Sequence, residues 1–315
     1  MKEPLIVLTG PTAAGKTALS IQLAKAIGGE IISADSMQVY KYMDIGTAKI
    51  RPEEMEGVPH YLVDTLEPDA PFNVVIFQHM AKEAMKCIRQ RGHIPIIVGG
   101  TGFYIQAVLN DIDFKDNDDD TAYRRALEDM AAAGGGDRLY AMLQEVDPEA
   151  AEKIHCHNIK KVIRALEYYH QTGQKISEHN AQESMKLSPY NFAYFVLNQP
   201  RELLYQRIDS RVDEMLRQGL VEEVRRLRDR GYTRELVSMQ GLGYKEILAY
   251  LDQEMTLEEA VYVLKRDTRH FAKRQLTWFK RERDVLWINQ SLYASKDDIL
   301  ADMTHILRQK GIIPL

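Results

Sequence analysis

Four short, mainly apolar runs occur in the first hundred residues, and segments of helical periodicity separate them. The runs cover residues 5–8, 30–33, 60–63 and 94–98. Apolar runs without regular polar alternation are typical of strands that are covered on both faces of a sheet. Segments 18–27 and 74–90 have helical spacing between the runs. This alternation predicts an α/β fold with a doubly wound, mainly parallel sheet, in which ligands bind at the carboxyl ends of the strands.

The first apolar run leads directly into a phosphate-binding loop. Its sequence is Gly10-Pro11-Thr12-Ala13-Ala14-Gly15-Lys16-Thr17, which fits the P-loop pattern G-x-x-x-x-G-K-[ST]. Glycines let backbone N–H groups surround an anion, and the helix that follows presents its positive end to it. Lys16 is suited to neutralise phosphate oxygens, and the Thr17 hydroxyl is suited to ligate Mg²⁺. The loop does not specify which phosphate compound binds.

The strand–helix pattern changes near residue 111. The aspartate-rich run 111–120 is typical of a solvated linker, and short helical segments with a glycine triplet at 134–136 follow it. We therefore predict a P-loop core over 1–112 and a helical insertion over 113–158. A late strand near 191–197 should rejoin the sheet, so 159–315 would contain the rest of the core and the C-terminal helices.

The net charge and the cysteine content bear on the partners and the cellular compartment of the protein. The 315 residues include 41 Lys and Arg against 46 Asp and Glu, so the net charge of −5 does not indicate a polyanion partner. The two cysteines give no disulfide framework and suit a reducing cytoplasm. The chain enters its first strand almost at once, and no apolar run approaches the roughly 18 residues of a membrane helix. We expect a cytoplasmic enzyme with no membrane segment and no signal peptide.

Segment 265–283 has a different charge balance from the rest of the chain. It contains eight Lys and Arg against only Asp267 and Glu282, and several of the basic residues share one helical face. A basic helix of this kind fits a nucleic-acid contact and equally fits an ordinary surface helix. Charge alone leaves both interpretations open.

Polar residues follow three of the predicted strands at the edge where ligands should bind. Asp35 follows the second strand and is suited to act as a general base or metal partner, or alternatively as a turn residue. Asp64 has a similar position and is a weaker candidate for helping to hold Mg²⁺ through water. Thr101, in the turn Gly99-Gly100-Thr101-Gly102, is suited to contact a ligand or to cap the next helix.

Several further motifs resemble those of the tRNA dimethylallyltransferases, also called isopentenyl-diphosphate:tRNA transferases. Besides the P-loop, the matching stretches are 33–40, 43–49, 98–104, 164–167, 240–245 and 268–278. Asp-Ile-Gly-Thr-Ala-Lys at 44–49 and Ala-Lys-Arg-Gln-Leu-Thr-Trp at 272–278 are more specific than the P-loop. The stretches span nearly the whole chain in the expected order. The chain resembles the bacterial form, without the zinc-finger extension of eukaryotic members.

The resemblance implies transfer of a dimethylallyl group from dimethylallyl diphosphate to the exocyclic N6 amine of the adenosine just 3′ of the anticodon. Asp35 would be the base, with Thr101 and Arg211 completing the catalytic set and Mg²⁺ as the cofactor. Among the arginines of segment 205–213, Arg211 is the preferred diphosphate ligand and Arg207 the second choice. The other implied diphosphate-binding residues are Gly10, Thr12, Ala13, Ala14, Gly15, Lys16 and Thr17.

The resemblance also implies a tRNA partner that is bound at its anticodon stem-loop. The target base must leave its stack to reach a buried site, and the helical insertion would clamp the stem. The resemblance also favours RNA binding as the function of the basic segment 265–283. We expect a monomer. The implied tRNA-binding residues are Asp35, Ser36, Met37, Gln38, Thr101, Arg124, Lys160, Lys161, Arg164, Gly243, Lys245, Arg269 and Lys273.

Two other functions share the P-loop and the parallel sheet. A small-molecule or nucleotide kinase would need an arginine-bearing lid, for which Arg124-Arg125 or Arg207 and Arg211 are the available candidates. A non-enzymatic nucleotide-binding RNA module would not need a carboxylate such as Asp35 beside the P-loop. Tests with ATP and with dimethylallyl diphosphate distinguish the three.

Overall fold

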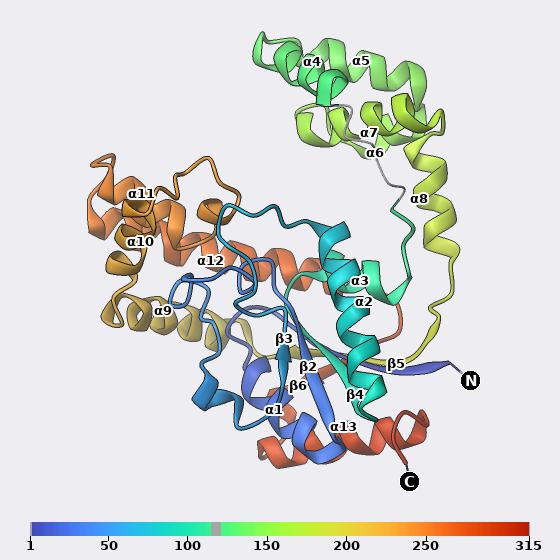
Figure 1. Cartoon of the computed structure of the whole chain (residues 1–315), viewed down its shortest axis with the longest axis vertical. Coiled ribbons are helices and arrows are strands. Elements are labelled where there is room, and N and C mark those ends of the chain that lie inside the picture. Colours follow the sequence, from blue (N-terminus) through green and yellow to red (C-terminus); the bar gives the residue numbers. More distant parts are fainter. Residues whose placement is uncertain (1, 115–120, 315) are drawn as a thin grey trace. The chain divides into compact units, whose positions relative to one another are not determined.

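The structure, a computed structural model, describes residues 2–114 and 121–314 and divides into two compact units. The core unit comprises Met1–Leu109 and Pro189–Leu315, and the insertion unit comprises Asn110–Ser188. Figure 1 shows the chain and its elements. Each unit has its own hydrophobic core, and each is described by itself.

The core unit is built on a six-stranded sheet with the order β3-β2-β4-β1-β5-β6, in which every pairing is parallel. This confirms the predicted α/β fold and parallel sheet. The strands are β1 Glu3–Thr9, β2 Gly29–Ala34, β3 His60–Tyr61, β4 Ile94–Gly99, β5 Tyr190–Asn198 and β6 Val285–Asn289. β3 is shorter than predicted, because Leu62 and Asp64 have left-handed φ angles of 59° and 57° that end the extended conformation.

Helices cover both faces of this sheet, which explains why its strands are mainly apolar. The inward residues of β1 alternate, so that Leu5 and Val7 join one core cluster while Ile6 and Leu8 join the other. Helices α2 (Val74–Gln90) and α3 (Gly102–Leu109) contribute to the first cluster. Helices α1 (Lys16–Ile27) and α13 (Lys296–Gln309) contribute to the second (Figure 1).

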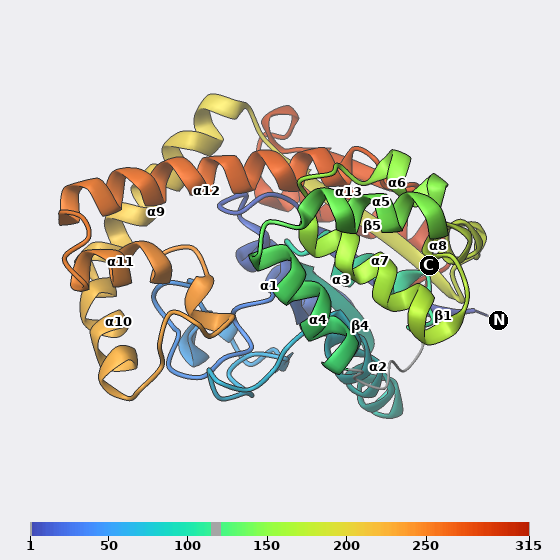
Figure 2. The same cartoon turned by 90° about the horizontal axis from the view of Figure 1, so that it is seen from above.

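The C-terminal part of the core unit is a group of helices beside the carboxyl ends of the strands. They are α9 Arg201–Arg217, α10 Leu220–Asp229, α11 Tyr244–Leu251 and α12 Leu257–Phe279, with a short 3₁₀ helix, Ser238–Gln240, between α10 and α11. Short 3₁₀ helices also occur at Pro52–Met55 and Gln290–Leu292. Figure 2 shows α12 as a long helix. It starts at a capping box, where the Thr256 side chain accepts a hydrogen bond from the Glu259 N–H. Within the described part of the chain, ion pairs join Lys265 of α12 to Asp213 of α9 (2.6 Å) and Arg269 of α12 to Asp209 of α9 (2.5 Å).

The insertion unit lies between β4 and β5 in the sequence and is helical, as predicted. Its helices are α4 Thr121–Ala132, α5 Gly136–Val146, α6 Pro148–Lys153, α7 Ile159–Thr172 and α8 Ile176–Met185. The expected range of 113–158 stops before α7, whereas the compact unit extends to Ser188. The reason is that Val162 and Leu166 of α7 pack in one core with Leu139 and Leu143 of α5. Residues 115–120 of the aspartate-rich run lie outside the described residues.

Candidate active site

The P-loop has the backbone that its glycines predict. Gly10 has a φ angle of 146°, and a Cβ atom there would lie 2.6 Å from the carbonyl oxygen of Leu197 on β5. Gly15 has a φ angle of 84° and is the N-cap of α1. Only glycine fits both requirements. The loop therefore wraps around the N-terminus of α1, where an anion is stabilised by the helix dipole.

Lys16 lies at the start of α1 with its ammonium turned back toward the loop. Its Nζ donates hydrogen bonds to the carbonyl oxygens of Gly10 (3.0 Å) and Pro11 (2.9 Å). Burial, together with the nearby charge of Arg211, lowers the pKa of Lys16 to about 8, although Asp35 acts in the opposite direction. An anionic ligand would offset both unfavourable effects, so this environment favours the binding of an anion.

Asp35 follows β2 directly and makes the turn that was considered as its alternative role. Its Oδ1 accepts hydrogen bonds from the N–H groups of Met37 (2.8 Å) and Gln38 (3.3 Å), which fixes a turn. Among the described residues, hydrogen bonds occupy only this oxygen. Asp35 lines a cavity, and Oδ2 is the carboxylate oxygen left for a ligand.

The cavity has a volume of about 390 Å³ and lies between the strand ends and the C-terminal helices. One side, the sheet wall, comes from the turns after the strands. Its residues are Thr12, Asp35, Ser36, Met37, Gly46, Thr47 and Thr101. The N–H of Thr101 donates to the carbonyl oxygen of Ala34 (3.2 Å), which places Thr101 beside Asp35. Most sheet-wall residues were among those predicted, but Gln38 does not line the cavity.

The opposite side, the helix wall, is mainly apolar. It consists of Ile208, Arg211, Val212 and Met215 on α9 and Leu264, Thr268, Phe271, Arg274 and Gln275 on α12. The α9 residues recur at helical spacing on one face. This wall suits an apolar ligand group next to the charged groups of the P-loop. Except for Arg211, its cavity contacts were not predicted, although the repeat at 208, 211, 212 and 215 was the available signal.

Arg211 and Arg207, the two arginines considered for diphosphate, occupy different environments. Arg211 lines the cavity, and its charge contributes to the lowered pKa of Lys16. Burial lowers the pKa of Arg211 itself, and the nearby charge of Asp35 opposes this shift. Arg207 is exposed and donates from Nη1 to Oε1 of Gln199 (2.5 Å). Arg207 is not among the residues that line the cavity.

Gln275 joins the two glycine-rich loops and was not among the residues predicted to act at the site. Its Oε1 accepts a hydrogen bond from the Thr12 N–H (2.9 Å), and its Nε2 donates to the Gly100 carbonyl oxygen (3.0 Å). A Cβ atom at Gly100 would lie 2.1 Å from that Nε2, which explains the glycine. One buried amide thus fixes the P-loop and the β4–α3 turn relative to α12.

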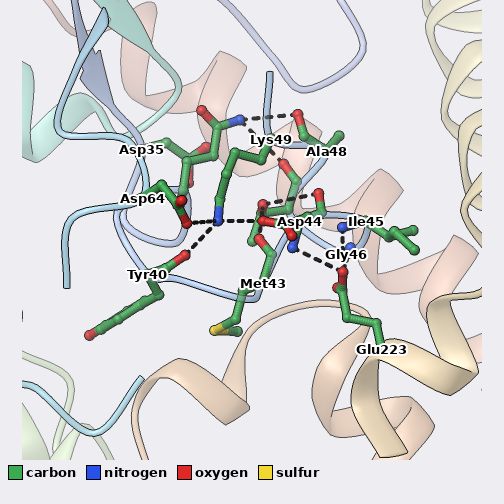
Figure 3. A network of polar contacts seen from close by, with 12 residues as sticks. Asp35, Tyr40, Met43, Asp44, Ile45, Gly46, Ala48, Lys49, Asp64 and Glu223 are labelled. Carbon is green, nitrogen blue, oxygen red and sulfur yellow. Dashed lines mark hydrogen bonds and ion pairs between the residues drawn. The ribbon is translucent and has the colours of Figure 1, made fainter. Parts of the chain in front are cut away.

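Asp64, the weaker candidate for a metal partner, is bound to a lysine instead. Lys49 Nζ donates to carboxylate oxygens of Asp64 (2.8 Å) and Asp44 (2.6 Å) and to the carbonyl oxygen of Tyr40 (2.7 Å) (Figure 3). Asp64 is not among the cavity-lining residues. Among the described residues, no cluster of three or more His, Cys, Asp or Glu side chains could hold a metal ion.

Comparisons with family models and with known proteins show to which family the chain belongs. The model of the IPP transferase family matches residues 38–282, and that of the isopentenyl transferase family matches residues 3–68. The chain belongs to the IPP transferase family. It is 64% identical over 311 residues to the tRNA dimethylallyltransferase of Lachnoclostridium phytofermentans and 52% identical over 312 residues to that of Carboxydothermus hydrogenoformans, with 99% of each chain covered in both comparisons.

Solved structures of other IPP transferases have the same fold. The tRNA isopentenylpyrophosphate transferase of Bacillus halodurans is 44% identical with a TM-score of 0.74, and 98% of each chain is covered. A eukaryotic dimethylallyltransferase acting on tRNA is 32% identical with a TM-score of 0.81, covering 95% of this chain and 80% of that one.

Among the described residues, no helix has the length and apolar character needed to cross a membrane.

The tRNA-binding residues that the resemblance implied in the core unit differ in how far other side chains neutralise them. Lys245 lines the cavity and lies 3.4 Å from Glu246 and 4.0 Å from Asp267. Arg269 is paired with Asp209 of α9 at 2.5 Å. Lys273 is exposed, and no ion pair to it occurs within the described part of the chain. Gly243, with a φ angle of 93°, is the N-cap of α11 and does not itself line the cavity.

The corresponding residues of the insertion unit lie on α4 and α7. Arg124 of α4 is paired with Glu128 (3.0 Å) and Glu167 (3.6 Å), and Arg164 is paired with the same Glu167 (3.0 Å). Lys160 and Lys161 are exposed in the first turn of α7. This unit therefore carries exposed positive charge on α7.

Proposed function

We propose that this IPP transferase transfers a dimethylallyl group from dimethylallyl diphosphate to N6 of the adenosine just 3′ of the anticodon in tRNA and releases diphosphate. The observation that carries the proposal is the composition of one cavity. Thr12 of the P-loop, Asp35, Arg211 and the apolar side chains of the helix wall line it. The charges of Arg211 and Asp35 also act on Lys16 of the same P-loop. A kinase does not need an apolar wall beside its P-loop, whereas an allylic diphosphate has both an anionic and a hydrocarbon part.

The residues of the cavity divide the reaction between them. The C–O bond between the allyl group and the diphosphate breaks while a C–N bond to the adenine forms, and the amine loses one proton. Lys16 and Arg211 stabilise the negative charge that develops on the diphosphate. Asp35, through its free oxygen, orients the weakly nucleophilic amine and accepts the proton. Thr101, next to Asp35 on the sheet wall, assists in positioning the base.

The P-loop residues also fit Mg²⁺. Thr17 is exposed in the first turn of α1, directly beside Lys16. Mg²⁺ commonly takes one or two protein oxygens and completes its shell with water and substrate phosphates, so a single hydroxyl next to a diphosphate site is an adequate donor set. When bound, the ion would supply positive charge to the leaving group.

The macromolecular partner in this proposal is the anticodon stem-loop of tRNA. The adenosine must be turned out of its stack to reach Asp35, and exposed basic residues are available to contact phosphates. They include Lys273 of α12 and Lys160 and Lys161 of α7. We propose that the insertion unit clamps the anticodon stem, and that a cytoplasmic monomer carries out the reaction.

The test is transfer of radiolabel from dimethylallyl diphosphate into unmodified tRNA in the presence of Mg²⁺. Label in the adenosine beside the anticodon is the expected result. A parallel reaction contains ATP and no prenyl donor. Absence of prenyl transfer together with phosphoryl transfer from ATP would overturn the proposal in favour of a kinase.

A further inference from the structure

Glu223 of α10 is a buried carboxylate that is surrounded by hydrogen-bond donors. Only 3% of the residue is exposed. Its Oε2 accepts hydrogen bonds from the N–H groups of Asp44 (3.0 Å) and Ile45 (2.7 Å). Its Oε1 accepts from the Gly46 N–H (3.0 Å) and the Tyr244 hydroxyl (2.7 Å). Three consecutive backbone amides of one loop therefore depend on this carboxylate (Figure 3).

The loop that Glu223 holds contributes to the cavity. Gly46 and Thr47 belong to the sheet wall. A Cβ atom at Gly46 would lie 2.6 Å from the ring of Tyr244, so the loop packs closely on α11. Burial beside Glu223 raises the pKa of Tyr244 well above its usual value, which keeps its hydroxyl a donor. Glu223 therefore helps to fix the position of Gly46 and Thr47 in the sheet wall.

A short chain of hydrogen bonds connects the loop to Asp35. Gln38 Nε2 donates to the carbonyl oxygens of Thr47 and Ala48, both at 3.3 Å. The backbone N–H of the same Gln38 donates to Asp35 Oδ1 at 3.3 Å. Gln38 Oε1 accepts from the Ser33 hydroxyl of β2 at 3.2 Å. Gln38 is therefore held between the loop, the strand and the carboxylate.

We propose that Glu223 is a positioning residue for the reaction: it fixes the 44–48 loop, and through Gln38 it fixes the direction in which Asp35 presents its free oxygen. This inference rests on the proposed function, because it concerns the base of that reaction. A carboxylate has enough lone pairs for all four donors. A glutamine at the same position offers one acceptor oxygen and brings an NH₂ group toward N–H donors, so the loop must shift.

The first test compares Glu223→Gln with Glu30→Gln in the full-length protein. Glu30 is also almost fully buried and also accepts a hydrogen bond from a tyrosine, Tyr61 (2.7 Å), but it lies at the end of β2 opposite to Asp35. Glu223→Gln is expected to lower kcat by about 10- to 100-fold, since a displacement of about 1 Å has that effect on an oriented reaction. KM for dimethylallyl diphosphate should stay within about threefold of the unaltered value.

The control variant distinguishes positioning from loss of stability. Glu30→Gln should lower thermal stability without a comparable loss of kcat per folded molecule. Equal losses of kcat in the two variants would overturn the inference, because the effect would then follow from burying an amide anywhere in the core unit.

A second test places the same substitution in the Asp35→Ala background. If Glu223 acts through Asp35, Glu223→Gln should lower the residual kcat by less than about twofold there. Losses that multiply in the two backgrounds would show that Glu223 works independently of Asp35 and would overturn the inference.

Gln38→Ala gives a variant in which the buried carboxylate is intact. Gln38 is only half-buried, so the protein should fold. The inference expects a lower kcat at nearly unchanged KM for tRNA. A normal kcat with a raised KM for tRNA would make Gln38 a simple tRNA contact and would overturn the inference that Glu223 acts on Asp35 through Gln38.

If the unaltered protein transfers no dimethylallyl group, the proposed function fails, and the inference fails with it.

Discussion

The two walls of the cavity are built in different ways. The sheet wall consists of turns that follow parallel strands, so its residues are placed by backbone geometry and by short-range hydrogen bonds such as those of Asp35 with Met37 and Gln38. The helix wall consists of side chains one helical turn apart on α9 and α12. Its position depends on contacts between distant segments, including Gln275 with the P-loop. The sheet wall supplies the carboxylate of Asp35, which we propose as the base, and the helix wall supplies most of the apolar surface together with the charge of Arg211.

Loss of the carboxylate on the sheet wall should have the largest effect. Asp35→Ala is expected to lower kcat by roughly 10²–10⁴ while leaving tRNA affinity nearly unchanged, because proton acceptance contributes to the transition state and little to binding. Single-turnover transfer and filter binding with the same tRNA measure the two quantities. A near-normal rate would remove Asp35 as the base and would leave the sheet wall as a binding surface only.

On the helix wall, the largest effect is expected at Arg211. Arg211→Ala should weaken diphosphate binding and lower kcat/KM by about 10- to 100-fold, because hydrogen bonds to charged groups contribute about 1.5–3 kcal/mol each. Arg207→Ala is the matched control four residues away, and it should change either quantity by less than about threefold. If the two substitutions had equal effects, the cavity-lining position of Arg211 would not explain diphosphate binding.

A pH titration tests the charge of Lys16 in the P-loop. Because the pKa of Lys16 is lowered to about 8 in the free protein, raising the pH above that value removes its charge before the ligand binds. Affinity for diphosphate should therefore fall as the pH rises above about 8, by up to tenfold per unit, since the ligand must then bind together with a proton. Lys16→Arg, which stays charged, should show a flat profile from pH 7 to 10. A flat profile in the unaltered protein would contradict the lowered pKa.

The smallest effect is expected outside the cavity, on the exposed face of α12. Lys273→Glu should weaken tRNA binding by a few-fold and reduce the slope of log K against log salt by about one, as expected for one lost phosphate contact. Arg269→Ala should change the slope less, because Asp209 already pairs with that arginine. Lys296→Glu, an exposed charge on α13, is the control. An unchanged slope for Lys273→Glu would place this face of α12 outside the tRNA interface.

The sequence alone determined the parallel sheet and predicted most of the residues that form the sheet wall, Gly46 and Thr47 excepted. Apolar runs followed by glycine or aspartate report local backbone requirements, and the parallel arrangement brings their carboxyl ends to one edge. The P-loop glycines, Lys16, Asp35 and Thr101 were therefore placed from residues within a few positions of each other. The more specific motifs also supplied the family, which the comparisons confirm.

Only the tertiary structure decided the helix wall and the contacts that hold both walls in place. Gln275 lies 263 positions from Thr12, and Glu223 lies 177 positions from Gly46, so no local pattern reports either hydrogen bond. The pairing of Asp64 with Lys49 and the inclusion of α7 in the insertion unit were hidden for the same reason. Local sequence fixes the backbone conformation of a segment, whereas the choice of partner for a buried polar group or an apolar helix face depends on which distant segments pack against it.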